Sequence, residues 1–153
     1  MMVLLVVRIK GTINIPHNMD STLRFLNLNT KFSATLVPES PVYLGMLRKI
    51  SNLVAWSRVD ELVVKDLFTK KGKAMNSSFI SEAEIPPEYG NIDGLVKGIV
   101  EEKVKLSDIK KIRPFFRLSP PRGGFKRKTK RQYSDGGVLG KNTELPDLIR
   151  RML

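Results

Sequence analysis

The chain has 153 residues, 41% of them apolar, a formal charge of +12 at pH 7 and no cysteine. This length can close one sizeable core but not two. The lack of cysteine excludes disulfides and thiolate metal sites and favours an intracellular protein. The charge is unevenly spread, because residues 1–108 carry 14 basic and 12 acidic side chains whereas residues 109–153 carry 13 and 3. A nearly neutral body with a strongly basic C-terminal third predicts an anionic partner.

The first part of the chain alternates strand patterns with helical ones. The apolar run 1–7 is too short for a membrane span and lacks a cleavage site. With the alternating residues that follow, it predicts a strand over 3–10 whose far end reaches solvent. The same reasoning predicts a helix over 18–28, a strand over 32–37 and a helix over 40–54. Asn18 or Asp20 can cap the first helix and Ser40 the second. This order indicates a small sheet with helices on one face.

The middle of the chain is predicted to be mostly helical. Trp56 ends the second helical pattern and is expected in the core rather than as a stacking platform. A helix over 60–72 begins at the N-cap Asp60, and its closing lysines suit the helix dipole at least as well as a nucleic-acid site. Residues 73–91 lose periodicity and gain Ser, Pro and acidic residues, which predicts a surface loop. A helical pattern resumes over 93–101, and Ser107 can cap one further turn.

The last third contains a basic segment, residues 115–140, which we call the basic arm. Residues 115–118 are the best remaining strand candidate, and two prolines follow them. Residues 125–133 are basic at nearly every position between two aromatic residues, which fits either an extended hairpin or a segment disordered until bound. The glycines at 136, 137 and 140 are expected to turn the backbone. A last helix begins near Thr143, and its apolar stripe is expected to pin the arm to the body.

The basic arm has the chemistry of a polyanion binder. Between Ile109 and Ser134 there are ten basic residues and no acidic one. The irregular spacing of the cations suits a folded phosphate backbone better than one helix face, and each phosphate contact releases a counterion. The predicted phosphate contacts are Arg117, Arg122, Lys126, Arg127, Lys128, Lys130 and Arg131. We expect Phe125 and Tyr133 to stack on splayed bases, and Gly123 and Gly124 to allow close backbone approach.

Catalytic and metal chemistry find no support in the sequence. His17 is the single histidine, so no imidazole or thiolate partner completes a metal site, and it is expected to touch a phosphate or to lie exposed. The glycines do not match a phosphate-cradling loop. We therefore predict no enzyme activity, no cofactor, no metal and no small-molecule substrate. Two other readings of the charge stay open: a DNA-coating or chromatin protein, and an RNA-modifying enzyme whose catalytic group is not identified.

Three segments resemble one family. Residues 22–54, TLRFLNLNTKFSATLVPESPVYLGMLRKISNLV, are similar to the core of the large-subunit ribosomal protein L30 family. FRLSPPRGGFK at 116–126 and GGVLG at 136–140 resemble its longer archaeal and eukaryotic form, called L7 in eukaryotes. The chain starts directly on the first strand, without the basic N-terminal extension of the eukaryotic proteins, so an archaeal ribosome is expected.

The resemblance implies a fold and a set of contacts. The fold is α+β, a ferredoxin-like split β-α-β sandwich with a small, mostly antiparallel sheet, extra C-terminal helices and the basic arm. We expect a core over 1–57, additional helices and a loop over 58–114, and a third strand, the arm and the last helix over 115–153, all in one domain. Besides the arm, the implied RNA contacts are Lys10, Asn14, His17, Arg24, Asn29 and Lys31. Arg48 and Lys49 are either a solvated helix face or neighbours of these residues.

The function implied by the resemblance is that of a structural ribosomal protein in translation. It would bind and stabilise folded large-subunit ribosomal RNA within the cytoplasmic ribonucleoprotein. The 5S RNA and neighbouring large-subunit proteins are further candidate partners that the sequence neither selects nor excludes. Neither a membrane nor a second copy of the chain is expected as a partner.

Overall fold

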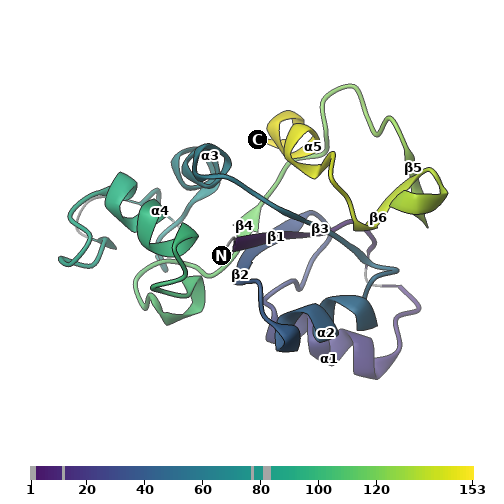
Figure 1. Cartoon of the computed structure of the whole chain (residues 1–153), viewed down its shortest axis with the longest axis horizontal. Helices are drawn as coiled ribbons and strands as arrows, with labels where there is room; N and C mark the ends of the chain where they lie inside the picture. Colours follow the sequence, from purple (N-terminus) through teal and green to yellow (C-terminus); the bar gives the residue numbers. More distant parts are fainter. Residues whose placement is uncertain (1–2, 12, 77, 81–83) are drawn as a thin grey trace.

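The computed structural model describes residues 3–11, 13–76, 78–80 and 84–153. The strands are β1 (Val3–Arg8), β2 (Ser33–Pro38), β3 (Val54–Arg58), β4 (Phe116–Arg117), β5 (Lys128–Gln132) and β6 (Gly137–Lys141). The α-helices are α1 (His17–Phe25), α2 (Pro41–Lys49), α3 (Glu61–Lys71), α4 (Ile92–Val100) and α5 (Leu145–Met152). The strands form one six-stranded sheet in the order β4-β2-β1-β3-β6-β5 (Figure 1). The predicted α+β, ferredoxin-like class is confirmed, and its division at residues 57 and 114 stays a prediction.

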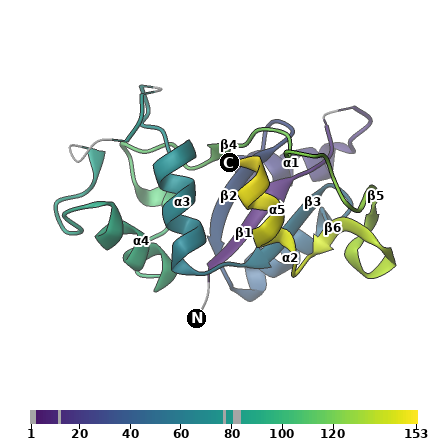
Figure 2. The ribbon, with the colours of Figure 1, turned by 90° about the horizontal axis from the view of Figure 1, so that it is seen from above.

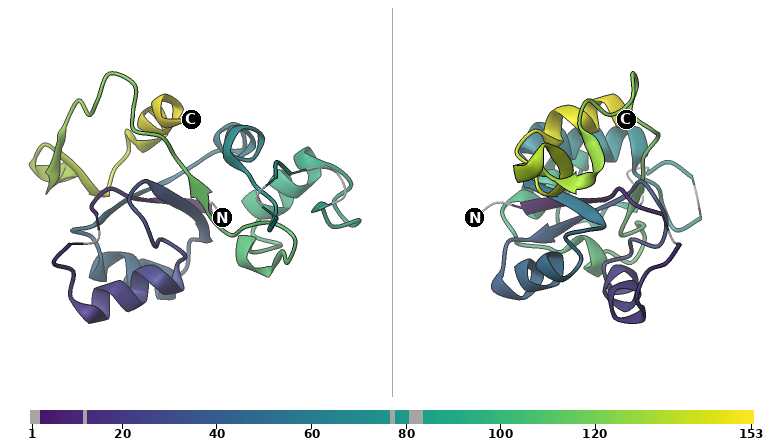
Figure 3. Two further views of the ribbon diagram at one scale, coloured as in Figure 1. Left: turned by 180° about the vertical axis from the view of Figure 1, so that it is seen from behind. Right: turned by 90° about the vertical axis from the view of Figure 1, so that its right-hand side faces the viewer.

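The sheet is mostly antiparallel and has helices on both faces. β1 pairs antiparallel with β2 and β3, and β2 with β4, whereas β6 runs parallel to both β3 and β5. α1 and α2 cover one face, as predicted for the first two helices, and α3 and α5 lie over the other (Figure 3). Alternation along β1 explains both layers, since Leu5 and Val7 join the cluster under α3, α4 and α5, while Leu4 and Val6 join the one under α1 and α2.

The helix after β2 is shorter than predicted. α2 ends at Lys49, and Val54 begins the unpredicted strand β3. Val54 and Trp56 point to the α1 and α2 side of the sheet while Ala55 points to the other side, which is strand alternation. Trp56 is 8% exposed, so its predicted place in the core is confirmed. The apolar residues in the turn between α2 and β3 happen to continue the helical spacing, which is why the sequence pattern predicts a longer helix.

Side chains cap α2, α3 and α4, the first two as predicted, whereas the predicted caps of α1 fail. The side chains of Ser40, Asp60 and Asn91 accept hydrogen bonds from the first turns of α2, α3 and α4. The predicted caps Asn18 and Asp20 are wrong, because Pro16 is the N-cap of α1 and both residues lie inside the helix. Residues 106–108 form the expected further turn as a 3-10 helix, but Ser107 lies inside this turn and does not cap it.

The glycine-rich end of the basic arm is a strand rather than only a turn. Gly136 and Gly140 have φ angles of 84° and 81° and do bend the backbone, yet residues 137–141 pair with β3 as β6. The segment before it is neither a hairpin nor unpaired, because β5 pairs in parallel with β6, in an irregular register. The predicted loop over 73–91 is described only in part, since residues 77 and 81–83 lie outside the described residues. Within it Lys73 bridges Phe79, and Ala74 bridges Ile112.

Candidate nucleic-acid interface

The basic arm crosses the full width of the sheet. It begins at β4, which forms one edge, and reaches β5, which forms the other. Between them the chain passes over the end of α5 (Figure 2). This path separates the predicted contacts, because Arg117 lies at the first edge, Arg122 and Lys126 lie along the crossing, and Lys128, Lys130 and Arg131 lie at the far edge. The arm therefore presents a line of cations rather than a single cluster.

The crossing segment is held by the last turn of α5. Ser119 N donates to the carbonyl of Met152 at 3.0 Å, and Arg122 N donates to that of Arg151 at 3.0 Å. In return, the Arg151 guanidinium donates to the carbonyls of Arg122 and Gly124, at 3.2 and 2.7 Å. Since α5 buries Leu145, Leu148, Ile149 and Met152 in the core, these bonds tie the arm to the folded body.

Arg127 forms an ion pair within the protein and is therefore not free to bind phosphate. Its Nε and Nη2 donate to the two carboxylate oxygens of Glu144 at 2.8 and 3.0 Å. Its guanidinium also lies 4.7 Å from the ring centroid of Tyr133, whose hydroxyl contacts Thr143 Oγ1 at 3.1 Å. The hydrogen bonds from Arg127 hold the pKa of Glu144 below its ordinary value. Of the predicted phosphate contacts, Arg127 is thus the one that pairs within the chain.

Acid should release this pair, and Arg127 itself can report the release. The pKa of Glu144 is lower in the folded protein than in the unfolded chain, so the pair stabilises the fold above the unfolded value and is lost as pH falls through the lowered one. The Nε–H resonance of Arg127 should titrate with a midpoint below the ordinary pKa of a glutamate. Glu144→Gln should abolish that titration. A midpoint at or above the ordinary value would contradict the pairing.

The two aromatic residues that are predicted to stack on bases, Phe125 and Tyr133, also make contacts within the protein. Phe125 is half-buried and stacks on Phe32, with ring centroids 6.1 Å apart and planes 28° apart. Lys31 Nζ lies 5.0 Å from the Phe32 centroid. The stack thereby places Lys31, a predicted RNA contact from the turn after α1, beside the crossing arm. Base stacking by Phe125 and Tyr133 stays a prediction, and it would use only the ring surface left uncovered.

The remaining cations of the arm are not paired by hydrogen bonds within the described chain, although the charge of Lys126 helps to lower the pKa of Glu144. Their side chains are exposed, and no hydrogen bond or ion pair joins them to another described residue. They are Arg117, Arg122, Lys126, Lys128, Lys130 and Arg131. Uncompensated surface cations of this kind are available to neutralise phosphates.

Buried Arg8 organises the loops at one end of the sheet. It is 1% exposed, which corrects the prediction that this end of β1 reaches solvent. Its guanidinium donates to the carbonyls of Lys10, Gly11 and Leu28, at 3.0, 3.1 and 2.7 Å. The loop after β1 and the turn after α1 are thereby fixed to one another. No sequence pattern marked Arg8 as different from a surface arginine.

These fixed loops bring several predicted contacts together. His17, Arg24 and Asn29 line one open hollow of about 690 Å³, with Ile15 and Asp20. His17 is exposed at the first turn of α1, and Arg24 pairs with Asp20 at 3.1 Å. Asn14 has a φ of 58° in the preceding loop. The hollow is polar and open, which suits contact with a sugar-phosphate chain better than enclosure of a small molecule.

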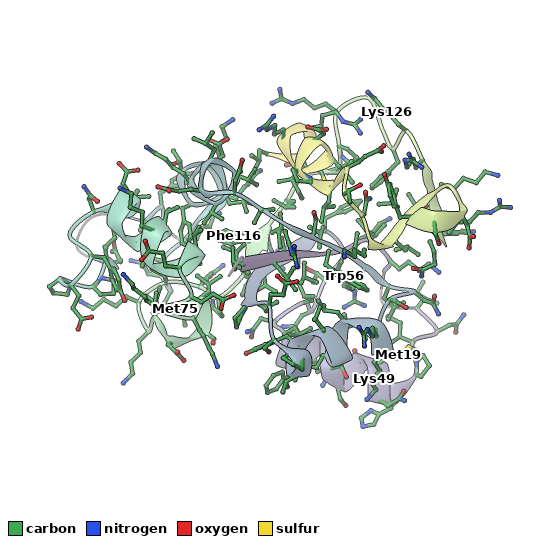
Figure 4. The ribbon with its side chains drawn as sticks, viewed as in Figure 1. Met19, Lys49, Trp56, Met75, Phe116 and Lys126 are labelled. Atoms are coloured by element: carbon green, nitrogen blue, oxygen red, sulfur yellow. The ribbon has the colours of Figure 1, made fainter. Side chains whose placement is uncertain are left out.

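The end of α2 joins the same end of the sheet. Lys10 N donates to Leu53 O at 3.2 Å, and the Gln132 amide donates to Ser51 O and Asn52 Oδ1 at 2.9 and 3.1 Å. The turn after α2 therefore touches both the loop after β1 and strand β5. Arg48 and Lys49, exposed in the last turn of α2, are neighbours of these basic segments. Figure 4 shows Lys49 and Lys126 on opposite sides of the sheet.

Other kinds of site are not found in the described part of the chain. No group of three or more His, Cys, Asp or Glu side chains there could hold a metal ion. Within the same residues, no helix is long and apolar enough to cross a membrane.

The split sheet, the paired helices and the line of uncompensated cations define a class: small, basic α+β proteins of the ribosomal type. The chain belongs to the ribosomal protein L30p/L7e family, whose family model matches residues 4–54. It is 39% identical to large ribosomal subunit protein uL30 of Cenarchaeum symbiosum (strain A) over 150 residues, covering 97% of each chain. The uL30 protein of Staphylothermus marinus is 36% identical over 156 residues, covering 97% of this chain and 96% of the relative. The predicted resemblance is thus confirmed.

Proposed function

We propose that this protein is a structural, non-enzymatic constituent of the large ribosomal subunit that binds and stabilises folded large-subunit ribosomal RNA. The observation that carries the proposal is the line of partnerless cations on an arm that the body itself holds in place. The names of the archaeal relatives, large ribosomal subunit protein uL30, support the same conclusion. As a part of the ribosome, it would act in the cytoplasm.

The proposed contacts fall into two groups with different roles. The cations of the arm neutralise phosphates and set the position of the protein on the RNA. The loops at the end of the sheet supply polar groups that reach sugar hydroxyls and base edges, which would favour RNA over DNA. The proposed loop contacts are Lys10, Asn14, His17, Arg24, Asn29, Lys31, Arg48 and Lys49. Gly123 and Gly124, with φ angles of 75° and 74°, have no side chains and would let the backbone of the arm approach the RNA closely.

Salt dependence tests the role of the arm. Two double variants, Arg122→Ala with Lys126→Ala and Lys128→Ala with Lys130→Ala, each remove two proposed phosphate contacts. In filter binding to large-subunit RNA, each pair should reduce the slope of log affinity against log salt by about 1.4 to 1.8 units, because each lost contact spares about 0.7 to 0.9 counterions. The stability of these variants should change little, since the four side chains are exposed and make no hydrogen bond or ion pair within the described chain.

A control variant removes two positive charges from a part of the protein that lies outside the arm. Lys97 and Lys103 lie on α4 and just after it, away from the arm, and their replacement by alanine should leave the slope unchanged. An equal loss in control and arm variants would mean that net charge alone drives binding. Equal affinities of the wild-type protein for duplex DNA and for large-subunit RNA would favour a DNA-coating protein instead. Comigration of the protein with the large subunit on a sucrose gradient after a high-salt wash would test whether the protein is part of the ribosome. Labelled 5S RNA added as a competitor would test whether 5S RNA is a further partner.

A further inference from the structure

A second basic surface lies at the β4 edge of the sheet, opposite the edge formed by β5. It is a cleft of about 310 Å³ between the end of α3, the segment after it, and the chain around β4. Met75, labelled in Figure 4, marks the segment after α3. The walls include the cations Lys70, Lys73, Arg113 and Arg117 and the rings of Phe79 and Phe115. Residues separated by more than 40 positions in sequence thus meet in one cleft.

The charge of this cleft exceeds what the neighbouring helix requires. Lys70 and Lys71 lie in the last turn of α3, where cations suit the helix dipole. Lys71 also donates to Ser119 Oγ at 3.0 Å, which ties the helix end to the start of the crossing arm. Lys73 and Arg117, however, come from outside the helix. No acidic residue in the described part of the chain lines the cleft, so it attracts anions.

The aromatic rings give the cleft a second kind of affinity. Phe79 is 68% exposed, so much of its ring is accessible to a base. Lys73 Nζ lies 6.0 Å from the Phe79 centroid, and the Arg113 guanidinium carbon lies 6.0 Å from the Phe115 centroid. A base that stacks on Phe79 would therefore place its own phosphate within reach of Lys73. Stacking platforms beside cations are the usual means of holding unpaired nucleotides.

We propose that this cleft binds an unpaired nucleotide of RNA, with Phe79 as the stacking platform and Lys70, Lys73 and Arg117 as phosphate contacts. The inference rests on the proposed RNA-binding function and extends it. Arg117 belongs both to the cleft and to the start of the basic arm, so the two surfaces are continuous. The protein would then hold RNA at both edges of its sheet, and the arm would connect the two sites.

Fluorescence tests the cleft directly. Phe79→Trp places an indole at the proposed platform, and decauridylate is the probe. Stacking should quench the emission of the new tryptophan, whereas the one native tryptophan, Trp56, is 8% exposed in the core and should respond little in the wild-type protein. In the Phe79→Trp background, Lys70→Gln with Lys73→Gln should lower the salt slope of the quenching titration by about 1.4 units. Lys97→Gln with Lys103→Gln is the matched control and should not change it.

A second measurement avoids the introduced tryptophan. In the otherwise native protein, Phe79→Ala should weaken decauridylate binding, followed by fluorescence anisotropy, by at least about fivefold, since stacking of one base is worth this much or more. Phe79→Tyr keeps a ring and should bind like the wild type.

The outcomes separate the two proposals. Binding of decauridylate without quenching of the Phe79→Trp protein, or an unchanged affinity in Phe79→Ala, would overturn the cleft as a nucleotide site. Either result would leave the proposed function standing, because the arm variants test binding to large-subunit RNA separately. If the Phe79→Ala protein were lost from the ribosomal particle while its affinity for RNA stayed unchanged, the cleft would also be overturned as a nucleotide site. That result would point to a protein partner. Failure of the wild-type protein to bind large-subunit RNA at all would instead overturn the proposed function.

Discussion

Replacing Arg8 by methionine should lower the free energy of unfolding by about 3 kcal/mol, because the buried carbonyl of Leu28 and two part-buried loop carbonyls would lose a charged donor. Arg8 is 1% exposed and bonds the carbonyls of Lys10, Gly11 and Leu28. Burial lowers the pKa of Arg8 and the nearby Asp20 carboxylate opposes that shift, yet a guanidinium remains protonated. Affinity for large-subunit RNA should fall as well, since the two loops that Arg8 joins carry proposed contacts.

Urea unfolding would measure this loss, with Arg24→Met as the matched control. The side chain of Arg24 is 74% exposed, and its ion pair within the described residues is with Asp20 one helical turn away, so its replacement should cost less than about 0.5 kcal/mol. Arg8→Lys keeps the charge but presents its donors from a single nitrogen, so it should recover only part of the stability. Equal effects of the two methionine substitutions would show that Arg8 is not the organiser of these loops.

Adding one methyl group at Gly137 should detach strand β5. A Cβ atom at this position would collide with the backbone carbonyl of Arg131, and a backbone atom cannot swing aside as a flexible side chain can. We expect Gly137→Ala to lower the free energy of unfolding by about 2 kcal/mol, within the range for overpacked sites. The affinity for large-subunit RNA should fall at least about tenfold, since Lys128, Lys130 and Arg131 would lose their fixed positions.

Gly45→Ala is the control for this prediction. Gly45 lies inside α2, and a Cβ there would meet nothing within 4 Å, so alanine should raise the free energy of unfolding by about 0.5 to 1 kcal/mol. Urea unfolding gives the stability of both variants, and amide hydrogen exchange over 128–132 reports the detachment of β5. Normal exchange in that segment of the Gly137→Ala protein would contradict the prediction.

The helices could be predicted because their signals are local. α3, α4 and α5 each show an apolar stripe at helical spacing, and α3 has a capping side chain in Asp60 that the structure uses. Strands β3 and β6 lack such local signals. β3 follows a helix whose spacing runs on into it, and β6 is rich in glycine, a poor strand former. β6 can pair with β5 because Gly137 lets the backbone of β5 approach closely, which is a property of the tertiary structure.

The candidate site divides in the same way. The cations of the arm could be predicted from composition, since ten basic residues without an acid are visible in the sequence alone. The pairing of Arg127 with Glu144 could not be predicted, because it depends on how the arm folds back onto α5. The cleft at β4 likewise joins Lys73 and Phe79 to Arg117 only after the sheet has formed. Sequence composition shows how much charge there is, and the fold decides which charges are available.

The bonds between the arm and α5 also constrain how the protein can fold during its own synthesis. Two of the acceptors that hold the arm are the carbonyls of Arg151 and Met152 in α5, which follow the whole sheet in the sequence and so leave the exit tunnel after it. Until α5 has emerged, the body can close around β1, but those bonds cannot form. The basic segment is thus free of these anchors during the part of translation that precedes the emergence of α5, and it becomes fixed only afterwards.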